Sequence, residues 1–171
     1  MALRKLRDAS PPQGWSRSFY RAPIVLYRMG LGGLLGRRFI LLHHVGRRSG
    51  LARQAVLEVV RHDPATNTCI IASGFGERAD WFRNLMAQPE ARIELGWKRI
   101  DIRAERLPLD EAELEMLDYG QRNPRSAKLV AKLIGYEHDG TDEDLRSLAG
   151  VLPLIRLQPL DAGSRQPSVT G

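Results

Sequence analysis

The segment "GRRSGLAR", residues 46–53, places arginine and serine side chains around two glycines. Glycine lets the backbone turn tightly and leaves amide N–H groups exposed, and a guanidinium group can donate two hydrogen bonds to one phosphate. This combination predicts a site for a phosphate or another polyanion, formed by Arg48, Ser49, Gly50 and Arg53. The neighbouring Arg47 either adds to this site or faces solvent. A basic hairpin turn that binds only water is the alternative.

A second group of candidate residues lies further along the chain, in the segment "SGFGERADWFRN", residues 73–84. The glycines give a flexible backbone edge, Trp81 and Phe82 offer aromatic surface, and Asn84 adds a polar group. In a small barrel this edge lies close enough to contact a planar ring held against the sheet. The alternative for Trp81 is a place in the hydrophobic core.

The sequence contains no recognisable catalytic or metal-binding set. His43 and His44 are neighbours in a predicted strand, so their side chains project to opposite faces and cannot share one metal ion. Cys69 is the single cysteine and lies in an apolar run, which excludes an internal disulfide and favours a small buried residue. No Gly-x-Ser-x-Gly elbow, P-loop or dinucleotide-binding glycine motif is present. We therefore assign no catalytic residue and no metal from the sequence.

The net charge of +6 is concentrated in the first third of the chain. Residues 1–61 carry 12 Lys and Arg against 2 acidic residues, whereas residues 62–171 carry 14 against 18. This asymmetry predicts an anionic partner for the N-terminal part: a phosphate-bearing cofactor, a lipid headgroup surface or a nucleic acid. A nucleic acid is disfavoured, because the basic part lacks interleaved aromatics and a recognition motif.

The hydrophobic pattern predicts six strands, at residues 38–45, 51–61, 68–73, 91–95, 98–107 and 151–160. Helices are predicted at residues 20–35, 81–88, 109–122 and 125–135, with a short one ending at Gly150. Asp80 is the predicted N-cap of the helix at 81–88. Because a helix does not follow every strand, we expect a mainly antiparallel barrel or half-barrel with flanking helices.

The same pattern predicts one domain, over residues 20–160. Residues 1–19 form a basic N-terminal extension and residues 161–171 a disordered tail. No apolar run reaches the roughly 18 residues that a membrane-spanning helix needs, and no signal peptide is evident, so we expect a cytoplasmic protein.

Two motifs, in the order and spacing expected of one protein family, carry a resemblance. "GRRSGLAR" followed by "IIASGFGERADWFRNLMAQPEARIEL" resembles the deazaflavin-dependent nitroreductases and quinone reductases, a branch of the split β-barrel flavoproteins found mainly in actinobacteria. The resemblance runs from about Tyr20 to Pro159. It implies an FMN-binding split-barrel-like fold of about six antiparallel strands. It also implies coenzyme F420, with FMN as the alternative cofactor, and hydride transfer to a quinone, a nitro compound or a conjugated enone.

The resemblance also implies roles for particular residues. The phosphate and acidic tail of the deazaflavin would be held by Arg48, Ser49, Gly50 and Arg53. Its ring system would contact Val56, Leu57, Ser73 and Gly74, with Trp81 and Asn84 behind. This chain lacks the tyrosine cluster that family members active on nitro compounds carry in their C-terminal helical region, since no tyrosine lies between Tyr119 and Tyr136. The acceptor is therefore left open between quinone, nitro compound and enone.

The predicted N-terminal helix suggests two further possibilities. Arginines alternate there with apolar residues, so the segment either docks peripherally on the anionic inner face of a membrane or packs on the barrel. A noncatalytic protein that binds a flavin, a deazaflavin or a lipid is the alternative function. The sequence leaves the oligomeric state open.

Overall fold

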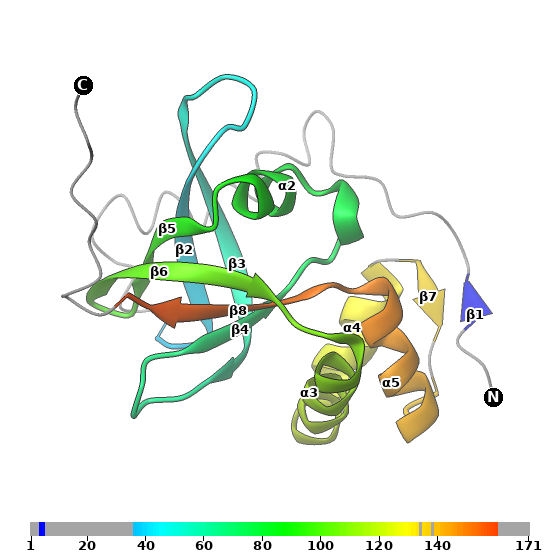
Figure 1. The fold of residues 1–171 in the computed structure, drawn as a ribbon. Helices are drawn as coiled ribbons and strands as arrows, with labels where there is room; N and C mark the ends of the chain where they lie inside the picture. The colour runs from blue at the N-terminus through cyan, green and yellow to red at the C-terminus, as the bar shows by residue number, and fades with distance from the viewer. Residues whose placement is uncertain (1–3, 6–35, 134, 138, 161–171) are drawn as a thin grey trace, which may run out of the picture.

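The computed structural model describes residues 4–5, 36–133, 135–137 and 139–160. Its centre is a closed six-stranded barrel in the order β2-β3-β4-β8-β6-β5, with all neighbouring strands antiparallel (Figure 1). The strands are β2 (Phe39–Val45), β3 (Ala52–His62), β4 (Cys69–Ala72), β5 (Glu90–Leu95), β6 (Lys98–Arg106) and β8 (Leu154–Pro159). The six strands expected from the sequence are confirmed as a barrel.

Helices occupy two places around the barrel. The short 3-10 helix η2 (Gly76–Arg78) and α2 (Asp80–Ala87) follow β4, and α2 contacts β2. The helices α3 (Leu109–Arg122), α4 (Pro124–Leu133) and α5 (Asp142–Val151) lie together on one side of the barrel, between β6 and β8 in the chain (Figure 1). The β2–β3 hairpin projects away from these three helices (Figure 1).

Two local expectations need correction. Asp80 is the first residue of α2, while Ala79 holds the N-cap position with extended backbone and no side chain caps the helix. A two-stranded sheet joins β1 (Arg4–Lys5) to β7 (Tyr136–Glu137), and the hydrophobic pattern predicted no strand at either place. The predicted helix at 20–35 and tail at 161–171 lie outside the described residues.

The hydrophobic core has two parts, divided by the barrel wall. The interior is filled by residues that alternate along the strands and are fully buried, among them Ile40, Leu42, Ile71, Ile93, Ile102 and Ile155. Outward-facing Val60, Ile70 and Leu154 instead pack against helical residues such as Met116 and Leu148. Each such buried aliphatic side chain contributes about 1.5–3 kcal/mol. The helices therefore cover one outer face of β3, β4 and β8.

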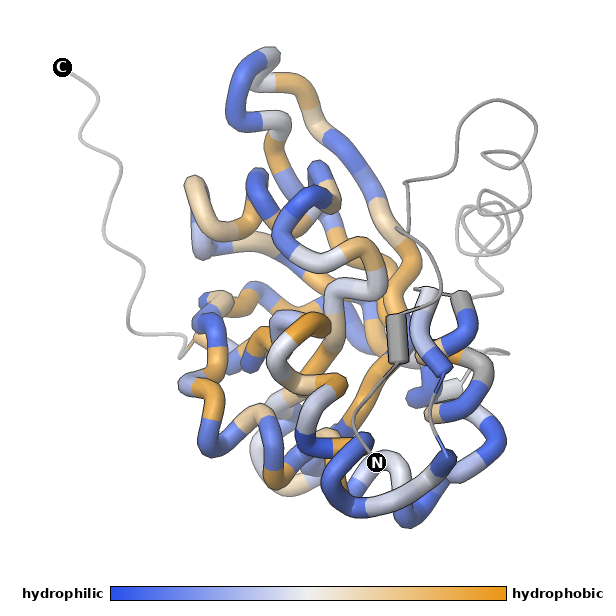
Figure 2. The backbone as a smooth tube through the Cα atoms, turned by 90° about the vertical axis from the view of Figure 1, so that its right-hand side faces the viewer, coloured by the Kyte–Doolittle hydropathy of each residue, from blue (hydrophilic) through white to orange (hydrophobic). Residues whose placement is uncertain are grey.

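Side chains alternate between the two faces of β3. Leu57 and Val59 pack against the barrel interior, while Val60 joins the cluster under the helices. A register shift between Val59 and Arg61 marks a bulge against β4. In Figure 2 the protruding hairpin alternates between hydrophilic and hydrophobic segments, whereas the strand segments inside the molecule are mainly hydrophobic.

Candidate functional site

The turn between β2 and β3, residues 46–51, is closed by two backbone hydrogen bonds. The Gly46 N–H donates to the Leu51 carbonyl at 2.9 Å, and the Gly50 N–H donates to the Gly46 carbonyl at 2.8 Å. Gly50 has a φ of +66°, a conformation that side-chain-bearing residues rarely adopt. A Cβ at Gly46 would lie 2.6 Å from the Ser49 Oγ. Both glycines therefore have a geometric reason to be here.

Arg47 anchors this turn to helix α2 instead of facing solvent. Its backbone N–H donates to the Asn84 Oδ1 at 3.1 Å, and its Nη1 donates to the same oxygen at 2.8 Å. The guanidinium group also donates to the Asp80 Oδ1, at 3.2 and 3.3 Å. Because Asp80 and Asn84 are four residues apart on one helix, both face the turn.

The other end of the Asn84 amide meets His44. The Asn84 Nδ2 lies 3.2 Å from the His44 Nδ1, and the two residues are only 6% and 8% exposed. Since the Asn84 Oδ1 accepts from Arg47, its Nδ2 donates, so the His44 Nδ1 accepts and the ring proton is on Nε2. Burial lowers the pKa of His44 below 6.5, and the positive charge of Arg53 lowers it further. We call His44, Arg47, Asp80 and Asn84 the Asn84 network.

The four residues predicted to bind the anion lie together at the tip of the hairpin, and all are exposed. Neither Arg48 nor Arg53 forms an ion pair with another residue in the described part of the chain. The Ser49 Oγ accepts a hydrogen bond from the Leu51 N–H at 3.3 Å. We call Arg48, Ser49, Gly50 and Arg53 the cationic site. Its donor set suits the phosphate and carboxylates of a polyanionic cofactor tail.

Val56 and Leu57 lie in the middle of β3 and point to opposite faces. Leu57 pairs with Ile40 and packs against the barrel interior. Val56 pairs with Leu41 on the outer face. A ligand on the outside of the barrel would therefore meet the side chain of Val56, with Leu57 supporting the strand from within.

The polar groups of Ser73, in the loop after β4, form hydrogen bonds with the protein backbone. Ser73 is fully buried, its Oγ donates to the Gly76 carbonyl at 2.7 Å, and its N–H donates to the Pro153 carbonyl at 2.9 Å. Gly74, the next residue, is half-buried. The Ser73 hydroxyl thus stabilises the turn that leads into η2, and the backbone at Gly74 is the part of this loop accessible to a ligand.

Trp81 takes part in the packing of the hydrophobic core. Its side chain is half-buried and packs against the interior cluster. Its ring meets that of Phe82 edge to face, with centroids 6.2 Å apart. Trp81 and Asn84 both lie on α2. The Asn84 network joins this helix to the cationic turn, and Trp81 is not part of that network.

The remaining candidates for chemistry are accounted for by packing. His43 faces outward, with its Nε2 2.8 Å from the Glu94 Oε1, while His44 faces inward, as neighbouring strand residues must. Burial raises the pKa of the Cys69 thiol to about 11, which makes it a poor nucleophile. Within the described residues, no group of three or more His, Cys, Asp or Glu side chains is placed to hold a metal ion.

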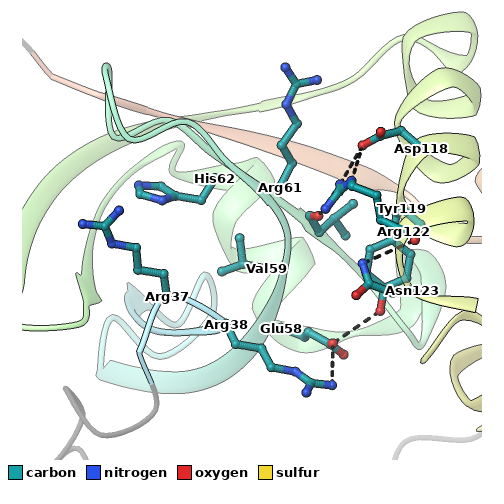
Figure 3. A pocket seen from close by; sticks show the side chains of 11 residues that line it. Arg37, Arg38, Glu58, Val59, Arg61, His62, Asp118, Tyr119, Arg122 and Asn123 are labelled. Carbon is teal, nitrogen blue, oxygen red and sulfur yellow. Dashed lines mark hydrogen bonds and ion pairs between the residues drawn. The ribbon is translucent and has the colours of Figure 1, made fainter. Parts of the chain in front are cut away.

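The structure adds a pocket that the sequence did not predict. It has a volume of about 600 Å³ and lies at the end of β3 far from the cationic site. Its lining, drawn in Figure 3, comes from Arg37 and Arg38, from β3 residues 58–62, and from positions 118, 119, 122 and 123 in α3 and just after it. We call it the β3–α3 pocket. Residues so far apart in the chain share no local motif, so the sequence carries no signal for it.

Comparison with known proteins gives one family and a fold. The family described as F420H(2)-dependent quinone reductase matches residues 20–127. The structure of an F420-H2 dependent reductase, FDR-A, is similar with a TM-score of 0.50 and 20% identity, over 72% of this chain and 96% of that one. The protein Atu2129 from Agrobacterium tumefaciens, of unknown function, has a TM-score of 0.52 and 20% identity, over 88% and 59% of the two chains.

These structural likenesses confirm the split β-barrel fold. No curated protein sequence matches the chain. None of the helices in the described ranges is long and apolar enough to cross a membrane.

Proposed function

Because the chain belongs to the F420H(2)-dependent quinone reductase family, we propose that its electron acceptor is a quinone and that the cofactor binds at the β2–β3 turn. Family membership makes the chain an F420-dependent reductase with coenzyme F420 as its cofactor. FMN is not needed as an alternative. The noncatalytic binding protein considered from the sequence gives way to a reductase.

The arginines of the cationic site, which are exposed and form no ion pair with any residue that the structure describes, carry the proposal for cofactor binding. Arg48 and Arg53 provide the guanidinium groups, while Gly50 gives the backbone its bend and Ser49 a hydroxyl. We expect them to bind the phosphate and acidic tail. When bound, the reduced coenzyme supplies a hydride, and the quinone takes up one further proton to become a hydroquinone. The chain's contribution is to orient the two partners.

The other predicted residues extend from this site along β3 and α2. In the proposal Val56 contacts the ring system from the outer face of β3, and Leu57 keeps that strand in place. In the loop after β4 the backbone at Gly74 forms the polar edge, Ser73 stabilises that loop from within, and Trp81 closes the site from α2. Asn84 holds the turn in position through Arg47. No residue is assigned as a proton donor.

A titration with oxidised coenzyme F420, followed by fluorescence, tests the cofactor site. Arg48→Ala and Arg53→Ala should each weaken binding about ten- to a hundredfold, because each removes charge-assisted hydrogen bonds. Arg146→Ala is the matched control, since Arg146 is an exposed arginine on α5 with no ion pair among the described residues. Equal losses in all three variants would indicate a diffuse field in place of a site, and no binding by the wild type would overturn the proposal.

The choice of acceptor is tested by turnover. Reduced F420 should be oxidised faster with a naphthoquinone than with a nitroaromatic or a cyclohexenone, since the tyrosines typical of nitro-reducing relatives are missing here. A higher kcat/KM for the nitroaromatic or the enone would reverse this order.

Peripheral association with an anionic membrane is also part of the proposal, because one described feature favours it. Trp97, 74% exposed, lies in the β5–β6 turn next to Lys98 and Arg99. Exposed tryptophans with flanking cations are typical of membrane–water interfaces. This turn lies beside Gly36, whose carbonyl is 3.9 Å from a Cβ built on Gly96.

Cosedimentation with anionic liposomes at low and high salt measures this association. Trp97→Ser should reduce the pelleted fraction at low salt, whereas Leu114→Ser, at an exposed leucine on α3, should not. A wild-type protein that remains in the supernatant at low salt would contradict membrane association and leave the reductase assignment intact.

A further inference from the structure

The β3–α3 pocket has the size of a small-molecule site and a polar lining. Its volume of about 600 Å³ lies in the middle of the range of ligand pockets, roughly 300–1,000 Å³. Figure 3 shows Arg37 and His62 side by side at one end and the α3 residues Tyr119 and Arg122 at the other. Between them Val59 is one of only two apolar residues in the lining.

The acidic residues of the pocket are already bound to neighbours. The Glu58 Oε1 accepts from the Tyr119 hydroxyl at 3.3 Å and from the Arg38 Nη2 at 3.4 Å. The Asp118 carboxylate pairs with Arg122, one turn later on α3, at 2.6 Å. Burial and the charge of Glu58 raise the pKa of Tyr119 to about 12, so its hydroxyl keeps its proton and remains a donor. These contacts offset both negative charges of the lining.

Positive charge and one hydrogen-bonding atom remain available. Of the four arginines in the lining, Arg38, Arg61 and Arg122 form ion pairs with Glu58, Glu115 and Asp118, whereas Arg37 forms no ion pair with any described residue. The His62 Nε2 is buried and, among the described residues, has no hydrogen-bond partner. An unpartnered buried polar atom is unfavourable unless a ligand or water bonds to it. Arg37 and His62 therefore form the end of the pocket suited to an anion.

The pocket also lies along the strand that carries the proposed cofactor site. Glu58 and Val56 are two residues apart on β3, so both side chains project from its outer face. Val56 is the residue proposed to contact the ring system. The α3 end of the pocket, at Glu58, therefore continues the face that carries Val56. His62 pairs with the interior residue Cys69, so the Arg37–His62 end lies on the other side of β3 (Figure 3), and a molecule in the pocket would reach around the end of this strand.

From this arrangement we propose that the β3–α3 pocket binds an electron acceptor that carries a carboxylate or phosphate group, and that Arg37 and His62 recognise this group. The proposal rests on the proposed function in that the bound molecule is the acceptor. It distinguishes this chain's substrate from an uncharged quinone.

The test compares a naphthoquinone bearing a carboxylate side chain with its methyl ester. With reduced F420, the wild type should show a kcat/KM about tenfold higher for the acid than for the ester, mainly through KM. Arg37→Ala should bring the ratio near one, and Arg37→Lys should keep part of it. Because each variant serves as its own reference, a general loss of activity leaves the ratio unaffected. Arg146→Ala should behave as the wild type, which separates a local contact from the overall charge.

A second measurement uses the protein without cofactor. Calorimetric titration should show tighter binding of the acid than of the ester, and inorganic phosphate should compete with the acid. His62→Leu should weaken binding of the acid and leave binding of the ester unchanged. Equal kcat/KM values for acid and ester in the wild type, or an unchanged ratio in Arg37→Ala, would overturn the pocket assignment while normal cofactor binding keeps the reductase proposal. Binding of the acid without turnover of either quinone would instead support the pocket and contradict the quinone acceptor.

Discussion

Asn84 shows how one buried side chain can hold a surface turn in place. Its amide oxygen accepts from the backbone and side chain of Arg47, and its amide nitrogen donates to His44. No apolar side chain of similar size can make these bonds. The cationic turn is thereby tied to α2, and Arg48 is left pointing to solvent for a ligand.

Asn84→Ala should lower the free energy of unfolding by about 2–3 kcal/mol, because it leaves the Arg47 N–H and the His44 ring without their buried partner. Cofactor binding should weaken as well, since the turn loses its anchor. Urea denaturation and the F420 titration measure the two effects. Gln88→Ala, at an exposed position just after α2, should change the unfolding free energy by less than about 0.5 kcal/mol. Similar values for the two variants would show that the network does not stabilise the fold.

His44 makes the stability depend on pH. Its pKa is lowered in the folded protein by burial, then by Arg53 and His43, and only Asp80 acts in the opposite direction. The unfolded state therefore binds the proton more readily, so stability is full above pH 6.5 and is lost as the pH falls toward the folded pKa.

His44→Gln should weaken this dependence, since glutamine stays neutral. The measurement is the urea midpoint of wild type and variant at pH 7.5 and pH 5 on the same buffer system. His62 also has a lowered pKa, so some dependence of stability on pH remains in both wild type and variant. If the variant loses as much stability on acidification as the wild type, His44 is not the titrating group.

At the level of elements, the β2–β3 hairpin owes its tip to a backbone that only glycine adopts easily. Gly50 has positive φ and open space where a Cβ would be, so its conformation alone determines the residue type. Gly150 likewise has nothing within 4 Å of an added Cβ, but it lies in helix α5. The two glycines form a matched pair that differs in backbone conformation.

Gly50→Ala should destabilise the protein by about 1 kcal/mol, because a Cβ is disfavoured at this φ. Gly150→Ala should stabilise it by about 0.4–1 kcal/mol, because alanine loses less backbone entropy in a helix. Thermal or urea unfolding of both variants measures whether each substitution raises or lowers the free energy of unfolding. Stabilisation by Gly50→Ala would mean that the turn does not hold its left-handed residue in solution.

At the scale of the whole molecule, the basic hairpin and the three helices lie on different sides of the barrel. The helices cover one outer face of the barrel, and the basic hairpin projects on the opposite side (Figure 1). The net charge of +6 adds a general attraction for an acidic cofactor to the direct contacts of the cationic site.

Cofactor affinity should therefore fall as salt rises, because exposed charges are screened beyond a Debye length of about 10 Å at 0.1 M. The Arg48→Ala/Arg53→Ala double variant should show a weaker salt dependence between 50 and 500 mM NaCl in addition to weaker binding. The F420 titration at each salt concentration measures both. The same salt dependence in double variant and wild type would place the attraction elsewhere on the surface.

The sequence alone determined the features that depend on local geometry. Adjacency in a predicted strand placed His43 and His44 on opposite faces, and the same geometry separates Val56 from Leu57 on β3. Glycines and arginines at close spacing predicted an exposed cationic turn, and this is where Arg48 and Arg53 lie. These signals are readable because each depends on residues within one turn or one strand.

Only the tertiary structure decided what those elements meet. The barrel closes through β2 against β5 and β8 between β4 and β6, pairings that local periodicity does not encode. Arg47 contacts Asn84 across 37 positions of the chain, and Tyr119 reaches Glu58 across 61. Such contacts arise from the packing of buried surfaces between distant segments, which is why the Asn84 network and the β3–α3 pocket became visible only once the chain was folded.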